Sequence, residues 1–268
     1  MIKLLKKYWR FTVMGLHEAF TYRAMLIIWI LQSLVWLAVI PFVWIVVYGE
    51  RDSVAGYSTQ LLVSYFFYIP IIETLVVSFV YDPIQSDIKE GNIAGHVMRP
   101  ASYLVSLFFG SLGYRCIRLI ITLIIILAIY PFFHEFILLP QLSVELWWFL
   151  PIIVVGSIIG FLIAALVGIL AFWTTQAEWG KHAWWMVSSF AAGYIAPIAF
   201  YPEIVQRVLS LTPFPLLMQI PSALILGQLE SNLAWRALIL GIVWMVILGL
   251  TVWILWHRGL RRLDGVGL

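Results

Sequence analysis

The chain has 268 residues, of which 63% are hydrophobic and only 11% are charged, with a formal net charge of +3. This composition excludes a soluble globular domain, in which about a quarter of the residues are charged. Fourteen Trp, twelve Tyr and seventeen Phe supply rings that settle at the headgroup level of a bilayer. The sole cysteine, Cys116, excludes an internal disulfide and a cysteine metal cluster. We therefore expect an all-α integral membrane protein with no nucleic-acid partner.

The first 48 residues predict a surface helix followed by a span. Residues 1–23 place apolar side chains at near-helical spacing, with lysines and an arginine available to lipid headgroups, which indicates an interfacial helix. Residues 24–48 exceed the roughly 20 apolar residues that cross a bilayer, so we predict the first span there. A short charged turnaround leads to the second span, at about 61–81.

Residues 82–100, DPIQSDIKEGNIAGHVMRP, form a long polar interruption in the apolar chain, and we call this segment the knuckle. Asp82 can cap a helix, Pro83 suits its first position, and Gln85 can bond back to the cap. Gly91 supplies the left-handed residue that ends such a helix. The alternative is an ordinary loop between two spans, but these start and stop signals favour a docking helix.

After the knuckle, two arginines limit where the third span can lie. Arg115 and Arg118 are costly in mid-bilayer, so we place both near the inner headgroups. The third span is then at about 115–139, with residues 101–114 lying along or entering the membrane edge.

Three further spans are predicted at 145–172, 183–200 and 232–256. The fourth and fifth spans carry small residues on which another helix can pack closely. These small residues are Gly156, Ser157, Gly160, Ala164, Ala165 and Gly168 in the fourth span, and Ser188, Ser189, Ala192, Gly193 and Ala196 in the fifth. Between the last two spans, prolines divide residues 201–231 into pieces too short to cross, which predicts one or two short re-entrant or interfacial helices.

The distribution of cations predicts the orientation of these six spans. With both termini in the cytoplasm, thirteen of the sixteen Lys and Arg residues fall on the inner side. The three that fall outside are Arg51, Arg207 and Arg236. This asymmetry supports a single multi-pass domain over residues 1–268, with the knuckle in the cytoplasm.

The chain lacks the sequence patterns of common catalytic sites. It contains no G-x-x-x-x-G-K-[ST], no H-E-x-x-H and no G-x-S-x-G, so an enzyme is poorly supported. Glu73 is the one acidic residue well inside a predicted span, and such a carboxylate is a functional candidate as a proton carrier or a lining residue. The alternative is a neutral, hydrogen-bonded helix contact, and the sequence favours neither.

Several segments, in order, resemble a known family. They are the knuckle ending IKEGNIAGHVMRP, then FWTTQAEWG, LTPFPLLMQIPSALILGQL and the terminal HRGLRRLDGVG. Together with the basic N-terminal segment and the paired spans, they resemble the ABC-2 type transporter permeases, the membrane subunits of ATP-binding cassette exporters. The resemblance runs nearly end to end and rests on the order and spacing of the segments.

The resemblance implies that the knuckle is a coupling helix inserted into a separate ATP-binding cassette ATPase. The residues expected to meet that partner are Asp82, Asp87, Lys89, Glu90 and Arg99. ATP and Mg would be bound by the ATPase, leaving this chain with no cofactor and no catalysis. Members export lipids, glycans, peptides or drugs, and the resemblance places the chain among the lipids of a bacterial cytoplasmic (inner) membrane. The rival hypothesis is a secondary transporter that uses Glu73.

The resemblance also implies a substrate path between the first, second and fifth spans. The residues expected to line it are Trp29, Trp36, Phe66, Phe67, Glu73 and Tyr194. A second permease is expected, in a heterodimer or a homodimer. The small faces of the fourth and fifth spans would allow close contact, and the aromatic first span could meet the partner's fifth.

Overall fold

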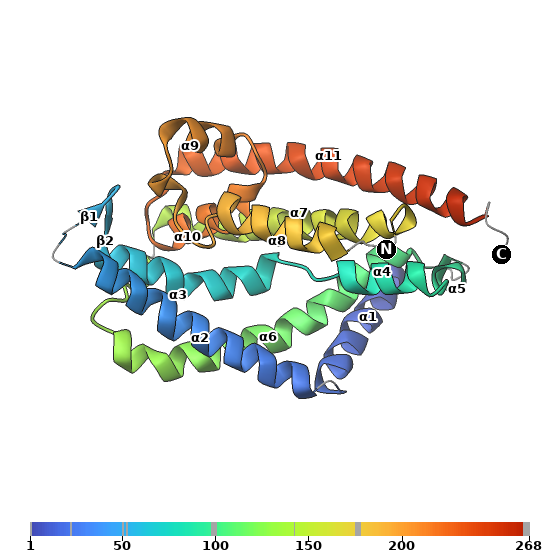
Figure 1. Ribbon diagram of the computed structural model, residues 1–268, viewed down its shortest axis with the longest axis horizontal. Helices are drawn as coiled ribbons and strands as arrows, with labels where there is room; N and C mark the ends of the chain where they lie inside the picture. Colours follow the sequence, from blue (N-terminus) through green and yellow to red (C-terminus); the bar gives the residue numbers. More distant parts are fainter. Residues whose placement is uncertain are drawn as a thin grey trace.

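The computed structural model describes residues 2–21, 23–49, 51, 53–97, 101–141, 143–174 and 178–264, which are largely helical (Figure 1). The first half contains α1 (Ile2–Thr21), α2 (Arg23–Tyr48), β1 (Ser53–Val54), β2 (Tyr57–Ser58), α3 (Thr59–Val76), α4 (Tyr81–Lys89), α5 (Ile93–Val97) and α6 (Tyr103–Phe133). The second half contains η1 (Val144–Trp148), α7 (Phe149–Ile169), η2 (Leu170–Phe172), α8 (Glu178–Ala191), η3 (Ile198–Phe200), α9 (Glu203–Ser210), η4 (Phe214–Leu216), α10 (Gln219–Ile225) and α11 (Ser231–Asp264).

Within the described residues, five helical stretches are long and apolar enough to cross a membrane. They are Ile27–Tyr48, Thr59–Lys89, Tyr103–Phe133, Val144–Phe172 and Ser231–Arg262. These stretches confirm an all-α, multi-pass membrane protein. They correspond to five of the six predicted spans, with shifted ends for the second and third.

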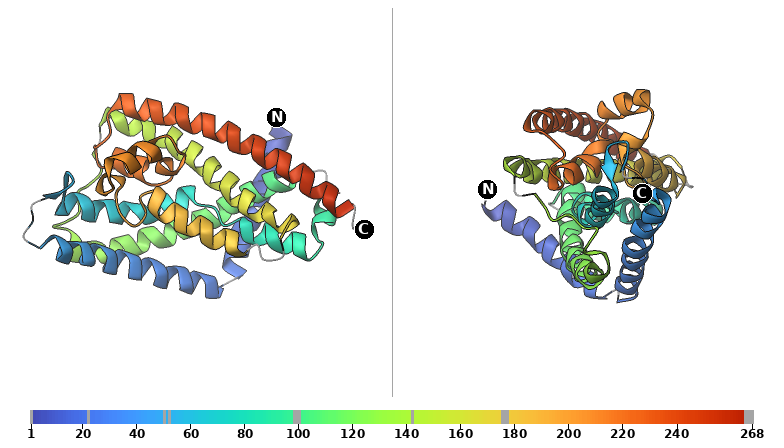
Figure 2. Two further views of the ribbon diagram at one scale, coloured as in Figure 1. Left: turned by 45° about the horizontal axis from the view of Figure 1, so that its top comes forward. Right: turned by 90° about the vertical axis from the view of Figure 1, so that its left-hand side faces the viewer.

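The helices α2, α3, α6, α7 and α11 run side by side, α1 crosses them near one end, and most short elements lie toward the two ends (Figures 1 and 2). The β1–β2 hairpin, α9 and α10 lie at one end. The α4 and α5 helices lie at the other end, together with the C-terminal end of α11. The knuckle is therefore on the same side of the bundle as the described end of the chain.

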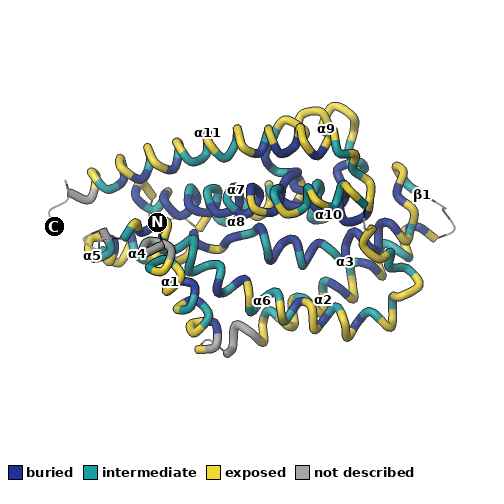
Figure 3. The backbone as a smooth tube through the Cα atoms, turned by 180° about the vertical axis from the view of Figure 1, so that it is seen from behind, coloured by how far each residue is buried: buried dark blue, intermediate teal, exposed yellow. Residues whose placement is uncertain are grey.

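The helices α3 and α7 form the centre of the bundle, whereas α2 and α11 present exposed apolar faces (Figure 3). The small face of α7 is used inside the chain. A Cβ at Gly160 would collide with the backbone of Val76, and one at Gly168 would meet Ile84. The predicted use of this face for a second permease is therefore wrong, because α3 and α4 already cover it.

The α3 helix begins where Ser58 accepts a hydrogen bond from the Leu61 N–H, which caps its first turn. It ends at Val76, and residues 77–80 leave the helical conformation before α4 begins. The predicted second span, 61–81, is thus a helix followed by a non-helical link.

The predicted third span is wrong at both ends. The α6 helix already begins at Tyr103, where a membrane-edge segment was expected, because its glycines allow α1 to pack directly against it. A Cβ at Gly113 would collide with the α1 backbone, and Thr12 donates to the Phe109 carbonyl at 2.9 Å. At the other end the helix stops at Phe133, because Ser64 of α3 accepts the Leu138 N–H at 2.7 Å and holds the next segment in a non-helical conformation.

The predicted fifth span, 183–200, is not one helix. The α8 helix spans 14 residues, or about 21 Å, which is short of a hydrocarbon core of about 30 Å. Gly193 then adopts a φ of +86°, which takes the chain out of the helix. Tyr65 donates to the Gly193 carbonyl, and Gln219 donates its N–H to the Ala192 carbonyl, so α3 and α10 hold this turn.

Two other predicted features coincide with helices. The N-terminal segment contains α1, and residues 201–231 contain α9 and α10. Their positions at or within a membrane surface stay predictions.

Candidate functional site

The buried carboxylate of Glu73 has a partner that the sequence did not reveal. The Nη2 of Arg118 lies 2.8 Å from the Glu73 Oε1, and both side chains are 12% exposed. The hydroxyl of Tyr194 donates to the other carboxylate oxygen over 3.3 Å. The three residues come from α3, α6 and the turn after α8, so the fold alone brings them together.

The second arginine of α6 secures the same end of α3. Arg115 donates to the backbone carbonyl of Leu75 at 2.8 Å, and also to the hydroxyl of Ser157 on α7. A cation there interacts favourably with the carbonyl end of a helix dipole. Both guanidinium groups turn inward to polar partners on α3 and α7, and their predicted depth near the inner headgroups stays a prediction.

Glu73 lies in the wall of a cavity of about 100 Å³. Aromatic rings form much of this wall, together with a few polar side chains. The lining residues are Gln32, Glu73, Val77, Phe79, Tyr81, Trp184, Trp185, Ser188, Ser189, Ala192, Tyr194, Leu217 and Met218. We call this space the Glu73 cavity.

An apolar groove of about 450 Å³ runs along α2. Its lining residues recur at helical spacing and are Ile28, Leu31, Gln32, Val35, Trp36, Val39 and Ile40. Gln32 belongs to both linings, so the groove and the Glu73 cavity adjoin. We call it the α2 groove.

The structure brings together four of the six predicted path residues. Glu73 and Tyr194 line the cavity, and the Trp36 ring lies 4.2 Å from the Tyr194 ring, between centroids. Phe66 is fully buried and contacts Trp36 edge-on.

The other two predicted path residues lie elsewhere. Phe67 packs against Phe133 in a separate apolar cluster, and Trp29 contacts Tyr114 of α6. Neither residue lines the cavity or the groove.

The knuckle has the predicted helix, with a different start. Gly91 adopts a φ of +77° and separates α4 from α5, as expected. Asp82, however, is not the cap: α4 begins one residue earlier, at Tyr81, and Val80 provides no side-chain cap. Gln85 does not bond back to a cap either, since its buried side chain points to the Val167 carbonyl of α7.

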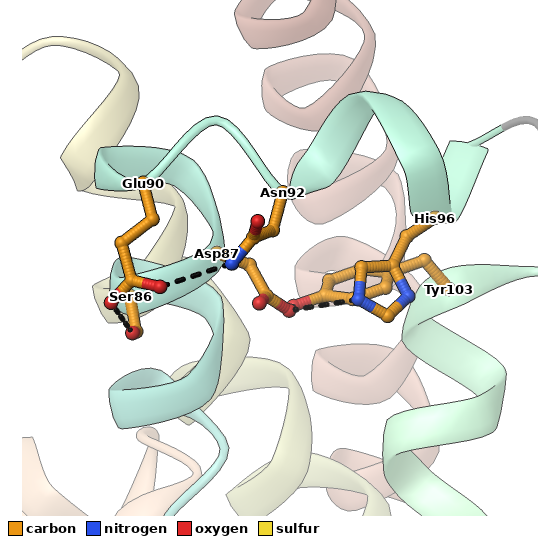
Figure 4. Close-up of polar contacts among 6 residues, drawn as sticks. All are labelled: Ser86, Asp87, Glu90, Asn92, His96 and Tyr103. Atoms are coloured by element: carbon orange, nitrogen blue, oxygen red, sulfur yellow. Dashed lines mark hydrogen bonds and ion pairs between the residues drawn. The ribbon is translucent and has the colours of Figure 1, made fainter.

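Two acidic side chains of the knuckle, Asp87 and Glu90, have different polar partners (Figure 4). Asp87 is 21% exposed, accepts a hydrogen bond from the Tyr103 hydroxyl at 2.6 Å and lies 3.6 Å from the His96 ring nitrogen. Glu90 is exposed and accepts hydrogen bonds from Ser86 and Asn92. Asp87 is therefore not the exposed charge that was expected; it joins the knuckle to α6.

The other three predicted coupling residues differ in what surrounds them. Lys89 is exposed at the end of α4. Asp82 pairs with Lys181 of α8 at 2.9 Å. Arg99 lies outside the described residues.

Comparison with protein families decides the class of this bundle. The sequence model described as "ABC-2 family transporter protein" matches residues 34–267. The chain belongs to this family. A comparison with curated proteins found no match.

The family is a membrane component of transport rather than a catalytic enzyme, and membership implies association with an ABC ATPase subunit. Within the described residues of this ABC-2 family protein, no group of His, Cys, Asp and Glu could hold a metal ion.

A second polar link joins the knuckle of the ABC-2 protein to α8. Lys181 lies 2.9 Å from Glu178 and 2.9 Å from Asp82. The pKa of Lys181 is raised, mainly by its hydrogen bond to Glu178 and then by the one to Asp82. The hydrogen bond between Lys181 and Glu178 also lowers the pKa of Glu178. Both groups are therefore charged at neutral pH, and the knuckle is tied to α8 as well as to α6.

Sequence reasoning missed Arg118, Gln32, Trp184 and Trp185 as site residues of this ABC-2 protein. For Arg118 a signal was present: a carboxylate within a span usually has an ionic partner, and α6 carries the nearest predicted cations. The other three gave no signal, because ordinary packing uses the same residue types.

Replacing Tyr103 with phenylalanine should loosen the knuckle without unfolding the bundle. The substitution removes a hydrogen bond to a charged group, which is worth about 1.5–3 kcal/mol, and leaves Asp87 with His96 alone. We expect faster amide hydrogen exchange in α5, measured by mass spectrometry. Tyr130→Phe on the same helix is the control, and equal exchange in the two variants would contradict the proposed link.

Proposed function

We propose that this chain is the permease subunit of an ATP-driven exporter, and that its knuckle docks on a separate ATPase. Family membership over most of the chain supports transport, and the knuckle supports the coupling role. It is a two-part helical element at one end of the bundle, with Lys89 and Glu90 exposed. It is bonded to α6 through Asp87 and to α8 through Asp82, so a force on the knuckle reaches both helices directly.

We place the substrate path on the side of the bundle where the Glu73 cavity adjoins the α2 groove. A cavity with a carboxylate in its wall, beside an apolar groove, suits an amphipathic substrate: a lipid, a glycolipid, a hydrophobic peptide or a drug. The exposed apolar face of α2 also offers the surface for a second permease, identical or similar, which would enclose the groove. The membrane is the bacterial inner membrane, and the knuckle and both termini face the cytoplasm.

The alternative of a secondary transporter is less well supported by the geometry. A proton-carrying carboxylate must be able to gain and release its proton along a path. Glu73 instead has a fixed ionic partner in Arg118 and a hydroxyl partner in Tyr194. We therefore assign Glu73 to the wall of the path.

Purification through a tag on this chain tests the proposal. We expect an ATP-binding cassette ATPase to co-purify, and transport in liposomes to require ATP. Transport by the isolated chain with a proton gradient and no ATP would refute the exporter and favour the secondary transporter. The number of copies of this chain, and of any second permease, in native mass spectra would separate a homodimer from a heterodimer.

Charge reversal in the knuckle should uncouple the two subunits. In the double variant Lys89→Glu/Arg99→Glu, we expect the membrane domain to stay folded, because an exposed charge such as Lys89 contributes little to stability. Substrate-stimulated ATP hydrolysis should fall at least tenfold, because charges at a docking rim determine how partners associate.

The matched control is Arg236→Glu, an exposed charge on α11. It should leave ATP hydrolysis unchanged. Full stimulation and transport in the double variant would remove the knuckle from the docking surface.

A further inference from the structure

The wall of the Glu73 cavity presents a carboxylate, whereas the neighbouring guanidinium groups face elsewhere. Glu73 is part of the lining, but Arg115 and Arg118 are not. Arg115 points to the end of α3 and to α7, and Arg118 covers one oxygen of Glu73 from the α6 side. The charged side chain in the lining is therefore the Glu73 carboxylate, which Arg118 neutralises in part from the α6 side.

The aromatic part of the wall also favours a cation. The faces of aromatic rings carry partial negative charge and attract cations, most strongly at Trp and where water is excluded. Two rings of the lining already hold cations of the chain: Arg118 lies 5.3 Å from the centre of the Phe79 ring, and Lys181 lies 5.7 Å from that of Tyr81. Trp184, Trp185 and Tyr194 supply further rings to the lining.

The carboxylate of Glu73 has capacity for another donor. Its two oxygens offer about four lone-pair positions. Arg118 uses one at 2.8 Å, and the Tyr194 hydroxyl uses another at 3.3 Å. A second cation can therefore share the carboxylate with Arg118. The chain already contains the converse arrangement, in which two carboxylates, Asp82 and Glu178, share the Lys181 ammonium group.

The space around the carboxylate suits one part of an amphiphile, and the α2 groove suits the other. The cavity, at about 100 Å³, has room for a small head group, whereas the adjoining groove of about 450 Å³ is lined by aliphatic residues, Trp36 and Gln32. An alkyl chain leaving the cavity past Gln32 enters this groove.

We propose that the Glu73 cavity binds the cationic head group of an amphiphile, a primary amine or a quaternary ammonium, and that the α2 groove binds its alkyl chain. This inference rests on the proposed function, since it names the substrate class of the exporter. The head group lies between the Glu73 carboxylate and the rings of Trp184, Trp185 and Tyr194.

Three probes with the same alkyl chain and a photoreactive diazirine at its end test the proposal. They are an alkyltrimethylammonium, an alkyl sulfate and an alkyl maltoside. The tagged chain is purified into lipid nanodiscs with the subunits it retains and no ATP, and cross-linked peptides are quantified. We expect the ammonium probe to label residues 28–40 of α2 at least tenfold more than either other probe.

Two variants identify the site. Glu73→Gln should lower the ammonium labelling about tenfold. Trp185→Leu removes a ring that is 64% exposed, so the fold is retained, and labelling should fall several-fold. Glu203→Gln, an exposed carboxylate on α9, should leave labelling unchanged.

Each other outcome overturns the proposal. Stronger labelling by the sulfate probe would show that the cavity binds anions, held by the arginines. Equal labelling by all three probes would show that the groove is a general apolar surface. Full ammonium labelling in both Trp185→Leu and Glu73→Gln would place the head group elsewhere. Binding is measured without ATP, so it can succeed where ATPase association fails, and the two proposals can therefore fail separately.

Discussion

Replacing Arg118 with methionine should destabilise the bundle by about 3–5 kcal/mol, the usual cost of removing one partner from a buried ion pair. The substitution leaves the Glu73 carboxylate with only the Tyr194 hydroxyl, at 3.3 Å. We expect a large fall in the unfolding midpoint, measured by circular dichroism in detergent. We expect this loss of stability whatever the effect on transport, because the ion pair holds α3 against α6.

The chain supplies its own control for this result. Arg207 and Glu203 of α9 form a shorter ion pair, at 2.6 Å, but their side chains are 76% and 78% exposed. Arg207→Met should cost less than about 1 kcal/mol, because water solvates both charges. The double variant Glu73→Leu/Arg118→Met should recover most of the loss, since it leaves no unpaired charge. Equal effects of Arg118→Met and Arg207→Met would show that the Glu73 pair is effectively solvated.

Replacing Gly160 with leucine should prevent α3 and α7 from packing. Any Cβ at this position collides with the Val76 carbonyl, which is backbone and cannot rotate away. Overpacking usually costs 1–3 kcal/mol, and a clash with backbone should reach about 3 kcal/mol or more. We expect the fraction of folded protein to fall sharply, as measured by size-exclusion chromatography in detergent.

Gly249→Leu is the matched control, because a Cβ at Gly249 of α11 meets no atom within 4 Å. It should be neutral or slightly stabilising, as leucine is a better helix former than glycine. If the Gly160→Leu chain instead stays folded and only loses its second permease, the small face of α7 belongs to a subunit interface after all.

The sequence was a good guide to the features that depend on local chemistry. Long apolar runs located five of the membrane-crossing stretches, and Gly91 located the division between α4 and α5. In both cases the relevant information lies within a few turns of chain. The start of α4 was misplaced by two residues, because Asp82 is used by Lys181 of a distant helix and not by its own backbone.

The remaining errors concern contacts between distant segments. Residues 183–200 are apolar enough for a span, but Tyr65 of α3 and Gln219 of α10 hold the turn at Gly193. Arg118 lies 45 residues from Glu73 in the sequence, and only the packing of α6 on α3 brings them together. Residue spacing carries no information on such pairs.

Because of the link at residues 77–80, the knuckle is connected to Glu73 and to Arg118 in different ways. Along the chain, α4 is connected to Glu73 through this non-helical stretch, which lacks the continuous hydrogen-bond ladder of a helix. Arg118 is reached from Tyr103, the residue bonded to Asp87, through about 22 Å of unbroken α6 helix. We therefore expect a displacement of the knuckle to reach Arg118 more directly than Glu73, and the difference to act on the single 2.8 Å contact between the two side chains beside the cavity.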